Sequence, residues 1–209
     1  MDLFDSFIVL PSNRPAHQAA LAWCASRDGP RAVCLAGPSG TGKTQLARAA
    51  LARGDERHGW RCTWRLSAEQ VSNELIIALR RFEPWSLLGY PRPDAVLVEH
   101  LEFLERMEHT LAAVVQRLEA SRARLLLTAT CPGPTVPPLL EAALGRLGAR
   151  LAFTRRPGLW ERGHLAARLG RRAGLDSLPP GWWRHCRNAA EILGEIRLRS
   201  LVEQIRRAG

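Results

Sequence analysis

The chain has 209 residues and a formal net charge of +10, with 46% hydrophobic and 24% charged residues, a composition typical of a globular protein of one large domain or one domain with a small addition. No segment approaches the roughly 18 consecutive apolar residues of a membrane span. The acidic N-terminal segment also lacks the basic region of a signal peptide, so we expect a cytoplasmic protein that does not enter a membrane.

Segments of strand and helix character alternate along most of the chain. In chain order, the predicted helices cover residues 13–26, 43–52, 67–82, 104–118, 139–147, 159–173, 179–187 and 189–207, and the predicted strands cover 31–36, 60–66, 94–98, 124–129 and 150–154. Asn13 and Ser67 are the expected caps of the first and third helices. Apolar residues recur at helical spacing in the fourth helix, which indicates packing on a sheet.

Strands separated by helices imply parallel βαβ units and an α/β fold with a doubly wound sheet. The pattern changes at Arg155-Arg156-Pro157-Gly158, and beyond it we expect helices alone. We therefore predict an α/β base over residues 1–156 and a small, all-helical C-terminal domain over residues 157–209.

A phosphate-binding loop lies between the first strand and the second helix. It comprises Gly37, Pro38, Ser39, Gly40, Thr41, Gly42, Lys43 and Thr44, and it matches the pattern GxxxxGK[ST] in its required context. Glycines let successive backbone N–H groups turn inward around phosphates, and the helix that follows adds its positive end. Lys43 is expected to neutralise phosphate oxygens and Thr44 to ligate Mg²⁺. The motif predicts binding of a nucleoside triphosphate or diphosphate.

The basic residues other than Lys43 are all arginine, 29 in number. This bias weakens the case that each arginine was selected for a contact, but it strengthens the assignment of Lys43. A surface of this charge favours nucleic acid or an acidic protein as partner, and a merely solvated arginine surface is an equal alternative. The five cysteines are scattered without metal-ligand spacing, so we expect free thiols and no zinc.

An acid at the tip of a neighbouring strand often holds Mg²⁺ in phosphate-loop proteins. Here the predicted strand 94–98 is followed by Glu99 and His100. Glu99 is the candidate metal ligand or catalytic base. A neutral imidazole has little affinity for Mg²⁺, so His100 is a poor second ligand, and it could equally be a structural residue where the next helix begins.

The ordered series of motifs resembles the ATPase core of the bacterial replication initiator DnaA and its relatives, within the AAA+ class of P-loop NTPases. Besides the phosphate loop, it rests on FDSFIVLPSN (4–13), LSAEQVSNEL (66–75), VLVEHLEFL (96–104), LTAT (127–130), RLGAR (146–150) and NAAEILG (188–194). The resemblance implies that the helical domain is a lid over ATP or ADP with Mg²⁺. It also implies that Phe7, Ile8, Val9 and Asn13 border the adenine.

The departures from the family pattern concern hydrolysis. The family has two acids where this chain has Glu99 and His100. Thr130 falls at the first sensor position, and Ala190 stands where the family's second-sensor arginine is expected. Arg150 falls at the position of the arginine finger, which in this class stabilises charge in a neighbouring molecule's site.

The best functional hypothesis is a DnaA-like adenine nucleotide-binding protein in replication initiation or its regulation. It would hydrolyse ATP weakly or not at all and would use Arg150 on a AAA+ partner, either the initiator or a second copy. A core without the helix-turn-helix domain of the initiator is expected, as in the Hda branch of the family. One alternative is a nucleotide-gated, DNA-binding loader or remodeller. A small-molecule kinase is the third hypothesis, and the helical C-terminal domain argues against it.

Overall fold

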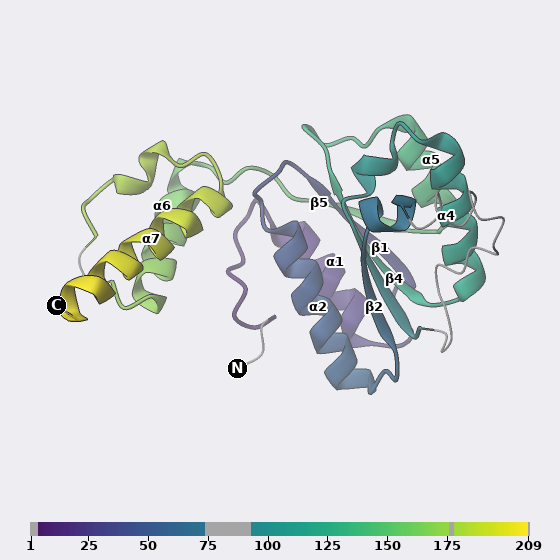
Figure 1. Cartoon of the computed structure of the whole chain (residues 1–209), viewed down its shortest axis with the longest axis horizontal. Helices are drawn as coiled ribbons and strands as arrows, with labels where there is room; N and C mark the ends of the chain where they lie inside the picture. Colours follow the sequence, from purple (N-terminus) through teal and green to yellow (C-terminus); the bar gives the residue numbers. More distant parts are fainter. Residues whose placement is uncertain (1–3, 74–92, 176–177, 209) are drawn as a thin grey trace.

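The computed structural model describes residues 4–73, 93–175 and 178–208. Its centre is a parallel sheet in the order β2-β3-β4-β1-β5. The strands are β1 (Ala32–Gly37), β2 (Thr63–Ser67), β3 (Ala95–Glu99), β4 (Arg124–Thr130) and β5 (Arg150–Phe153). The predicted α/β fold and the five predicted strands are confirmed, with bounds within three residues of those expected. Figure 1 shows the strands running side by side through the larger body of the molecule.

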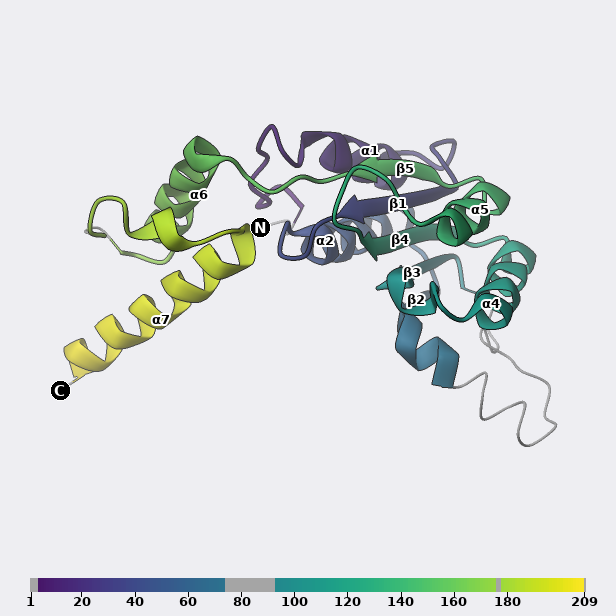
Figure 2. The same ribbon diagram turned by 90° about the horizontal axis from the view of Figure 1, so that it is seen from above.

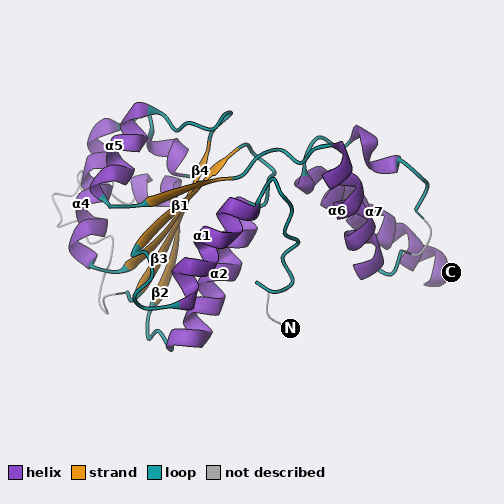
Figure 3. Cartoon of the chain, turned by 180° about the vertical axis from the view of Figure 1, so that it is seen from behind, coloured by secondary structure: helices purple, strands orange, loops and turns teal. Residues whose placement is uncertain are grey.

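Helices cover both faces of this sheet. The helices of the base are α1 (Arg14–Ala25), α2 (Lys43–His58), the 3₁₀ turn η1 (Leu101–Leu104), α4 (Glu108–Ser121) and α5 (Pro138–Arg146). One face packs on α1 and α2 through a cluster that contains Trp23, Leu35 and Leu46. The other packs on α4 and α5 through a separate cluster that contains Leu118 and Leu127. The two helical layers are visible on opposite sides of the strands in Figures 1 and 3.

Strand alternation explains why the sheet is buried on both sides. Side chains of successive residues point to opposite faces, so a central parallel strand is apolar throughout. Every residue of β1 and of β3 is buried, whereas β2 at the edge is only half-buried. Glu99 is therefore a buried acid at the carboxyl end of an otherwise apolar strand.

Some predicted helices and caps differ in detail from the structure. Asn13 precedes α1 as expected, but its side chain makes no capping hydrogen bond. Ser67 and Gln70 exchange hydrogen bonds through the Ser67 Oγ and the Gln70 Oε1, which confirms the cap, and residues 68–73 are helical. The rest of that helix, to residue 82, lies outside the described residues. The single helix expected over residues 104–118 is wrong at its start, because the chain forms η1 first and α4 begins only at Glu108.

The C-terminal part is helical and stands beside the sheet. It contains α6 (Leu159–Arg172), the 3₁₀ turn η2 (Trp182–His185) and α7 (Ala189–Ala208). The helix predicted over residues 179–187 is wrong, because residues 179–181 are not helical, Gly181 has a φ of +75°, and only the short turn η2 follows. Figure 2 shows α7 beginning beside the start of α2 and extending away from the strands.

The helical part has its own hydrophobic cluster. Leu165, Ile192 and Ile196 pack together there with Ile8 and Leu10 from the N-terminal segment. The N-terminal segment thus joins the sheet to the helices. Among the described residues, no helix combines the length and the apolar character needed to cross a membrane.

Candidate functional site

The phosphate loop connects the end of β1 to the start of α2 at the carboxyl edge of the sheet. Gly40 and Gly42 have φ values of +75° and +89°, a region that side chains with a Cβ rarely adopt. Gly37 lies against Thr154, the residue after β5, and a Cβ on Gly37 would come within 2.3 Å of the Thr154 carbonyl oxygen. The Thr154 hydroxyl in turn lies 2.6 Å from the Thr41 hydroxyl. Contacts with Thr154 therefore hold the phosphate loop in place.

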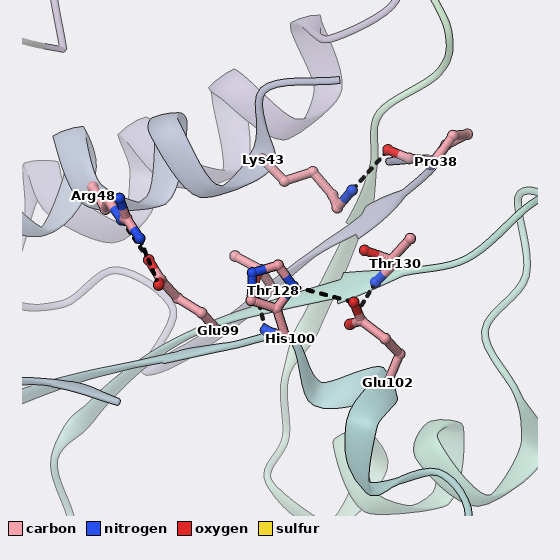
Figure 4. A network of polar contacts seen from close by, with 8 residues as sticks. All are labelled: Pro38, Lys43, Arg48, Glu99, His100, Glu102, Thr128 and Thr130. Carbon is pink, nitrogen blue, oxygen red and sulfur yellow. Dashed lines mark hydrogen bonds and ion pairs between the residues drawn. The ribbon is translucent and has the colours of Figure 1, made fainter. Parts of the chain in front are cut away.

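Lys43 occupies the first position of α2 and points back over the loop. Its ammonium Nζ donates a hydrogen bond of 2.8 Å to the Pro38 carbonyl (Figure 4). Lys43 is only 6% exposed. Burial lowers the pKa of Lys43 and the charge of Glu102 opposes that shift. An anion bound in the loop would give this buried cation a partner.

A cavity of about 250 Å³ lies above the loop, between the sheet and α7. It is lined by the phosphate loop, by the tips of β3 and β4 and by the start of α7: Ser39, Gly40, Gly42, Lys43, Thr44, Gln45, His100, Thr128, Thr130, Ala189, Ala190 and Leu193. The cavity combines backbone N–H donors, hydroxyl groups and one ammonium group. Such a set of donors suits phosphate oxygens.

A second, more apolar cavity adjoins the first. Its lining includes Phe7, Ile8, Asn13 and Thr41, together with Leu165, Leu169 and Leu193 from the helical part and further residues of both parts. Three of the four predicted adenine-bordering residues are thus brought together. Val9 is not among the lining residues and is 37% exposed.

Asn13 stabilises the backbone in the wall of this cavity. Its Oδ1 accepts a hydrogen bond of 2.8 Å from the Leu10 N–H, and its Nδ2 donates one of 3.1 Å to the Ile8 carbonyl. These two bonds hold the N-terminal segment in a turn. Asn13 therefore shapes the apolar cavity by fixing the backbone that carries Ile8.

Glu99, the predicted Mg²⁺ ligand and catalytic base, is engaged by an arginine. Arg48 on α2 donates from Nε to Oε1 over 2.7 Å and from Nη2 to Oε2 over 2.8 Å (Figure 4). The hydrogen bond to Glu99 raises the pKa of Arg48, so the guanidinium stays charged. The structure thus places Glu99 in an ion pair, and Thr44 is the predicted metal ligand that lies in the phosphate cavity.

The strand tips beside Glu99 form a second polar network. Glu102 accepts a hydrogen bond of 2.8 Å from the Thr130 N–H through Oε2, and its Oε1 lies 3.2 Å from His100 Nδ1. Burial acts to raise the pKa of Glu102, but the hydrogen bonds from Thr130 outweigh it and the pKa is lowered. His100 has a φ of +65°, and its N–H donates to the Thr128 hydroxyl. This uncommon backbone conformation aims the imidazole at the phosphate cavity.

The start of α7 touches the phosphate loop directly. The Ala190 N–H donates to the Gly40 carbonyl over 3.2 Å, and a Cβ on Gly40 would lie 2.5 Å from Asn188 Cγ. Asn188 and Glu191 cap the helix, with Asn188 Oδ1 accepting from the Glu191 N–H. Ala190 reaches this point with a methyl group only, so it offers no charge to a phosphate.

Arg150 lies on the edge strand β5, at the end of the sheet that is opposite the phosphate loop. It is the exposed first residue of β5 and pairs with Val33, four residues before the loop begins at Gly37. At roughly 3.3 Å per residue, this position is about 13 Å from the loop end of the sheet. Arg146, four residues earlier at the end of α5, forms an ion pair with Glu119 at 2.9 Å. Arg150 is thus placed away from the chain's own phosphate cavity.

A sequence model of the bacterial DnaA ATPase domain matches residues 1–153. The chain belongs to the DnaA ATPase domain family. It is 37% identical over 110 residues to the chromosomal replication initiator DnaA of Microcystis aeruginosa, covering 51% of this chain and 24% of that protein. It is 33% identical over 155 residues to DnaA of a Synechococcus strain, covering 71% of this chain and 33% of that protein. The chain therefore spans a third or less of these curated DnaA relatives.

Solved structures share the DnaA-type AAA+ fold. Domain III of Thermotoga maritima DnaA matches with a TM-score of 0.79 at 16% identity, over 97% of this chain and 88% of that one. A DnaA bound to AMPPCP and single-stranded DNA matches with a TM-score of 0.73 at 19% identity, over 98% and 68%. The DnaC helicase loader matches with a TM-score of 0.55 at 14% identity, over 73% and 96%.

Three residues of this DnaA-like site were not predicted: Arg48, Glu102 and Thr154. A signal for Arg48 existed, because it lies four positions after Thr44 and hence on the same helical face. Strand alternation also places Glu99 on the sheet face that α2 covers. No comparable pattern marks Glu102 or Thr154, since their partners come from distant segments.

Proposed function

We propose that this chain binds ATP or ADP between its base and its helical lid, with the boundary near residues 156 and 157. The observation that carries the proposal is Lys43, a buried cation that closes a loop of N–H donors beneath a cavity. The phosphates fit this loop. The apolar cavity lined by Phe7 and Ile8 fits a purine base next to it. The AMPPCP-bound DnaA structure of similar fold supports adenine as the base.

The residues expected to hold Mg²⁺ fit that ion poorly. Both oxygens of Glu99 bond Arg48, and the oxygens of Glu102 bond Thr130 and approach His100. Of the two predicted ligands, Thr44 remains without such a competing ion pair. We infer weak or absent intrinsic hydrolysis, because acids that are engaged in other contacts contribute less to the charge stabilisation that a bound metal supplies.

The proposed role is regulation of replication initiation through a AAA+ partner in the cytoplasm. Arg150 is exposed and remote from its own phosphate cavity, which suits a cation that enters a neighbouring molecule's site. The partner would be the initiator or a second copy of this chain. An inserted arginine of this kind can accelerate phosphoryl transfer by about 10³–10⁵.

The experiment is a phosphate-release assay on a purified DnaA initiator with ATP, with and without this protein. Acceleration that is lost in Arg150→Ala supports the proposal. Arg146→Ala is the matched control, since Arg146 is similarly exposed but already paired with Glu119. If the initiator is not accelerated, or if both variants act alike, Arg150 has no such role. Binding of fluorescent ADP by the protein alone tests the nucleotide site separately.

A second candidate function, binding of single-stranded DNA, is favoured by the charge of the helical part. Residues 157–209 contain ten arginines and five acidic residues, so they carry +5 of the total charge of +10. On α6, Trp160 is 71% exposed and stacks on His164 with 5.7 Å between ring centroids. Exposed aromatic rings in a basic surface suit stacking with unpaired bases.

Fluorescence anisotropy with a labelled oligonucleotide distinguishes this candidate from the first. We expect affinity that falls steeply with salt, weakens in Trp160→Ala and differs between ATP and ADP. Equal binding by wild type and Trp160→Ala at all salt concentrations would exclude the stacking surface.

A further inference from the structure

The ion pair between Arg48 and Glu99 consists of two hydrogen bonds and involves the helix that follows the phosphate loop. Both carboxylate oxygens accept from the guanidinium, at 2.7 Å and 2.8 Å. The Glu99 side chain is 7% exposed, whereas that of Arg48 is 46% exposed. A two-point contact of this kind fixes the carboxylate in one orientation. Each oxygen keeps a second lone pair, but a metal ion that binds this acid would have to compete with the charge of the guanidinium.

The contact also decides where Glu99 lies relative to the phosphates. Thr44 lines the phosphate cavity, and Arg48 lies four residues later on the same helix. One helical turn advances about 5.4 Å along the axis. Arg48 thus draws the Glu99 carboxylate toward the second turn of α2, away from the Thr44 hydroxyl. Figure 4 shows the pair separated from the Lys43 ammonium and from the His100 imidazole.

The neighbouring groups do not replace the lost acid. His100 faces the cavity as an imidazole, a weak ligand for Mg²⁺. Glu102 keeps its position through the Thr130 N–H and approaches His100. The protein's own cations balance the negative charges at this end of the sheet. Arg48 neutralises Glu99, and Lys43 faces the position where the phosphates would bind.

We propose that Arg48 is a positioning residue that withholds Glu99 from divalent cations, so that this chain binds its nucleotide with an affinity independent of Mg²⁺. The inference rests on the proposed nucleotide site. It has a converse. Without Arg48, Glu99 becomes an unpaired anion at the strand end, next to His100, which lines the phosphate cavity. Released from the pair, it repels nucleotide until a cation bridges the two.

The test compares the affinity for fluorescently labelled ADP in EDTA and in Mg²⁺. For wild type the two dissociation constants should agree within about twofold. For Arg48→Gln we expect binding in EDTA to weaken roughly tenfold and to recover with Mg²⁺, as expected for one uncompensated charge in a partly screened site. Adding Glu99→Gln to Arg48→Gln should remove the new dependence on Mg²⁺.

Arg53→Gln is the matched control, because Arg53 is on the same helix and pairs with surface Asp5 at 2.6 Å. It should behave as wild type. Arg48→Lys keeps the charge and serves if Arg48→Gln does not fold, and it should also show little dependence on Mg²⁺. Wild-type affinity that rises tenfold with Mg²⁺, or an Arg48→Gln variant with unchanged affinities, overturns the inference. A failure of wild type to bind ADP in either buffer overturns the proposed nucleotide site itself.

Discussion

Replacing Gly40 by alanine probes the contact between the phosphate loop and the start of α7, which belongs to the proposed lid. Gly40 has a φ of +75°, and its new Cβ would lie 2.5 Å from Asn188 Cγ. The Asn188 side chain must then move, and the hydrogen bond from the Ala190 N–H to the Gly40 carbonyl, 3.2 Å long, is displaced with it. The substitution should therefore loosen the lid as well as strain the loop.

The expected magnitude follows from three contributions. Holding alanine in the left-handed region costs about 1–2 kcal/mol, and loss of the lid hydrogen bond costs about 0.5–1.5 kcal/mol. Alanine also restricts the unfolded chain, which offsets about 0.4–1 kcal/mol. We expect Gly40→Ala to lower the free energy of unfolding by about 0.5–3 kcal/mol.

Urea denaturation of four proteins measures this: wild type, Gly40→Ala, Asn188→Ser and the double variant. Serine keeps a capping oxygen for α7 but is shorter, so it relieves the overlap. In the Asn188→Ser background the cost of Gly40→Ala should fall by more than about 0.5 kcal/mol. Gly194→Ala is the control, because a Cβ there meets nothing within 4 Å, and it should stabilise α7 by about 0.8–1 kcal/mol. Additive effects of the two substitutions would refute the contact between Asn188 and the loop.

Three further outcomes can be measured on the same protein. Burial, assisted by the charge of Arg53, lowers the pKa of His17 below 6.5. The unfolded state thus binds this proton first, and urea midpoints should decrease as pH falls from 6.5 toward the lowered pKa, an effect that His17→Gln should reduce. Thr154→Val removes a hydroxyl that lies 2.6 Å from that of Thr41 and 3.3 Å from the Ala36 carbonyl, and it should cost about 1 kcal/mol by urea denaturation, with no loss if neither bond forms. Burial raises the pKa of Cys34, so iodoacetamide followed by peptide mass spectrometry should find half-exposed Cys62 modified first.

The sequence predicted the fold well because its signals are local. Short apolar strands, helical periodicity and the glycine pattern around Lys43 each depend on neighbouring residues, and together they require a parallel sheet with the loop at its carboxyl edge. The helix expected over residues 179–187 failed for a local reason as well. Gly181 adopts a left-handed conformation with a φ of +75°, which a continuous helix does not allow, so only the short turn η2 forms.

The chemistry of the site was less predictable, since it depends on contacts between distant segments. The sequence alone predicted the loop positions of Lys43 and Thr44 from a motif, and it predicted the strand-end position of Glu99 from the apolar run before it. Only the tertiary structure decided that Glu99 faces Arg48, 51 residues away, and that Asn188 covers Gly40. The physical reason is that a motif specifies which backbone positions face a ligand, whereas the partner of a buried charge is set by packing between a helix and a sheet.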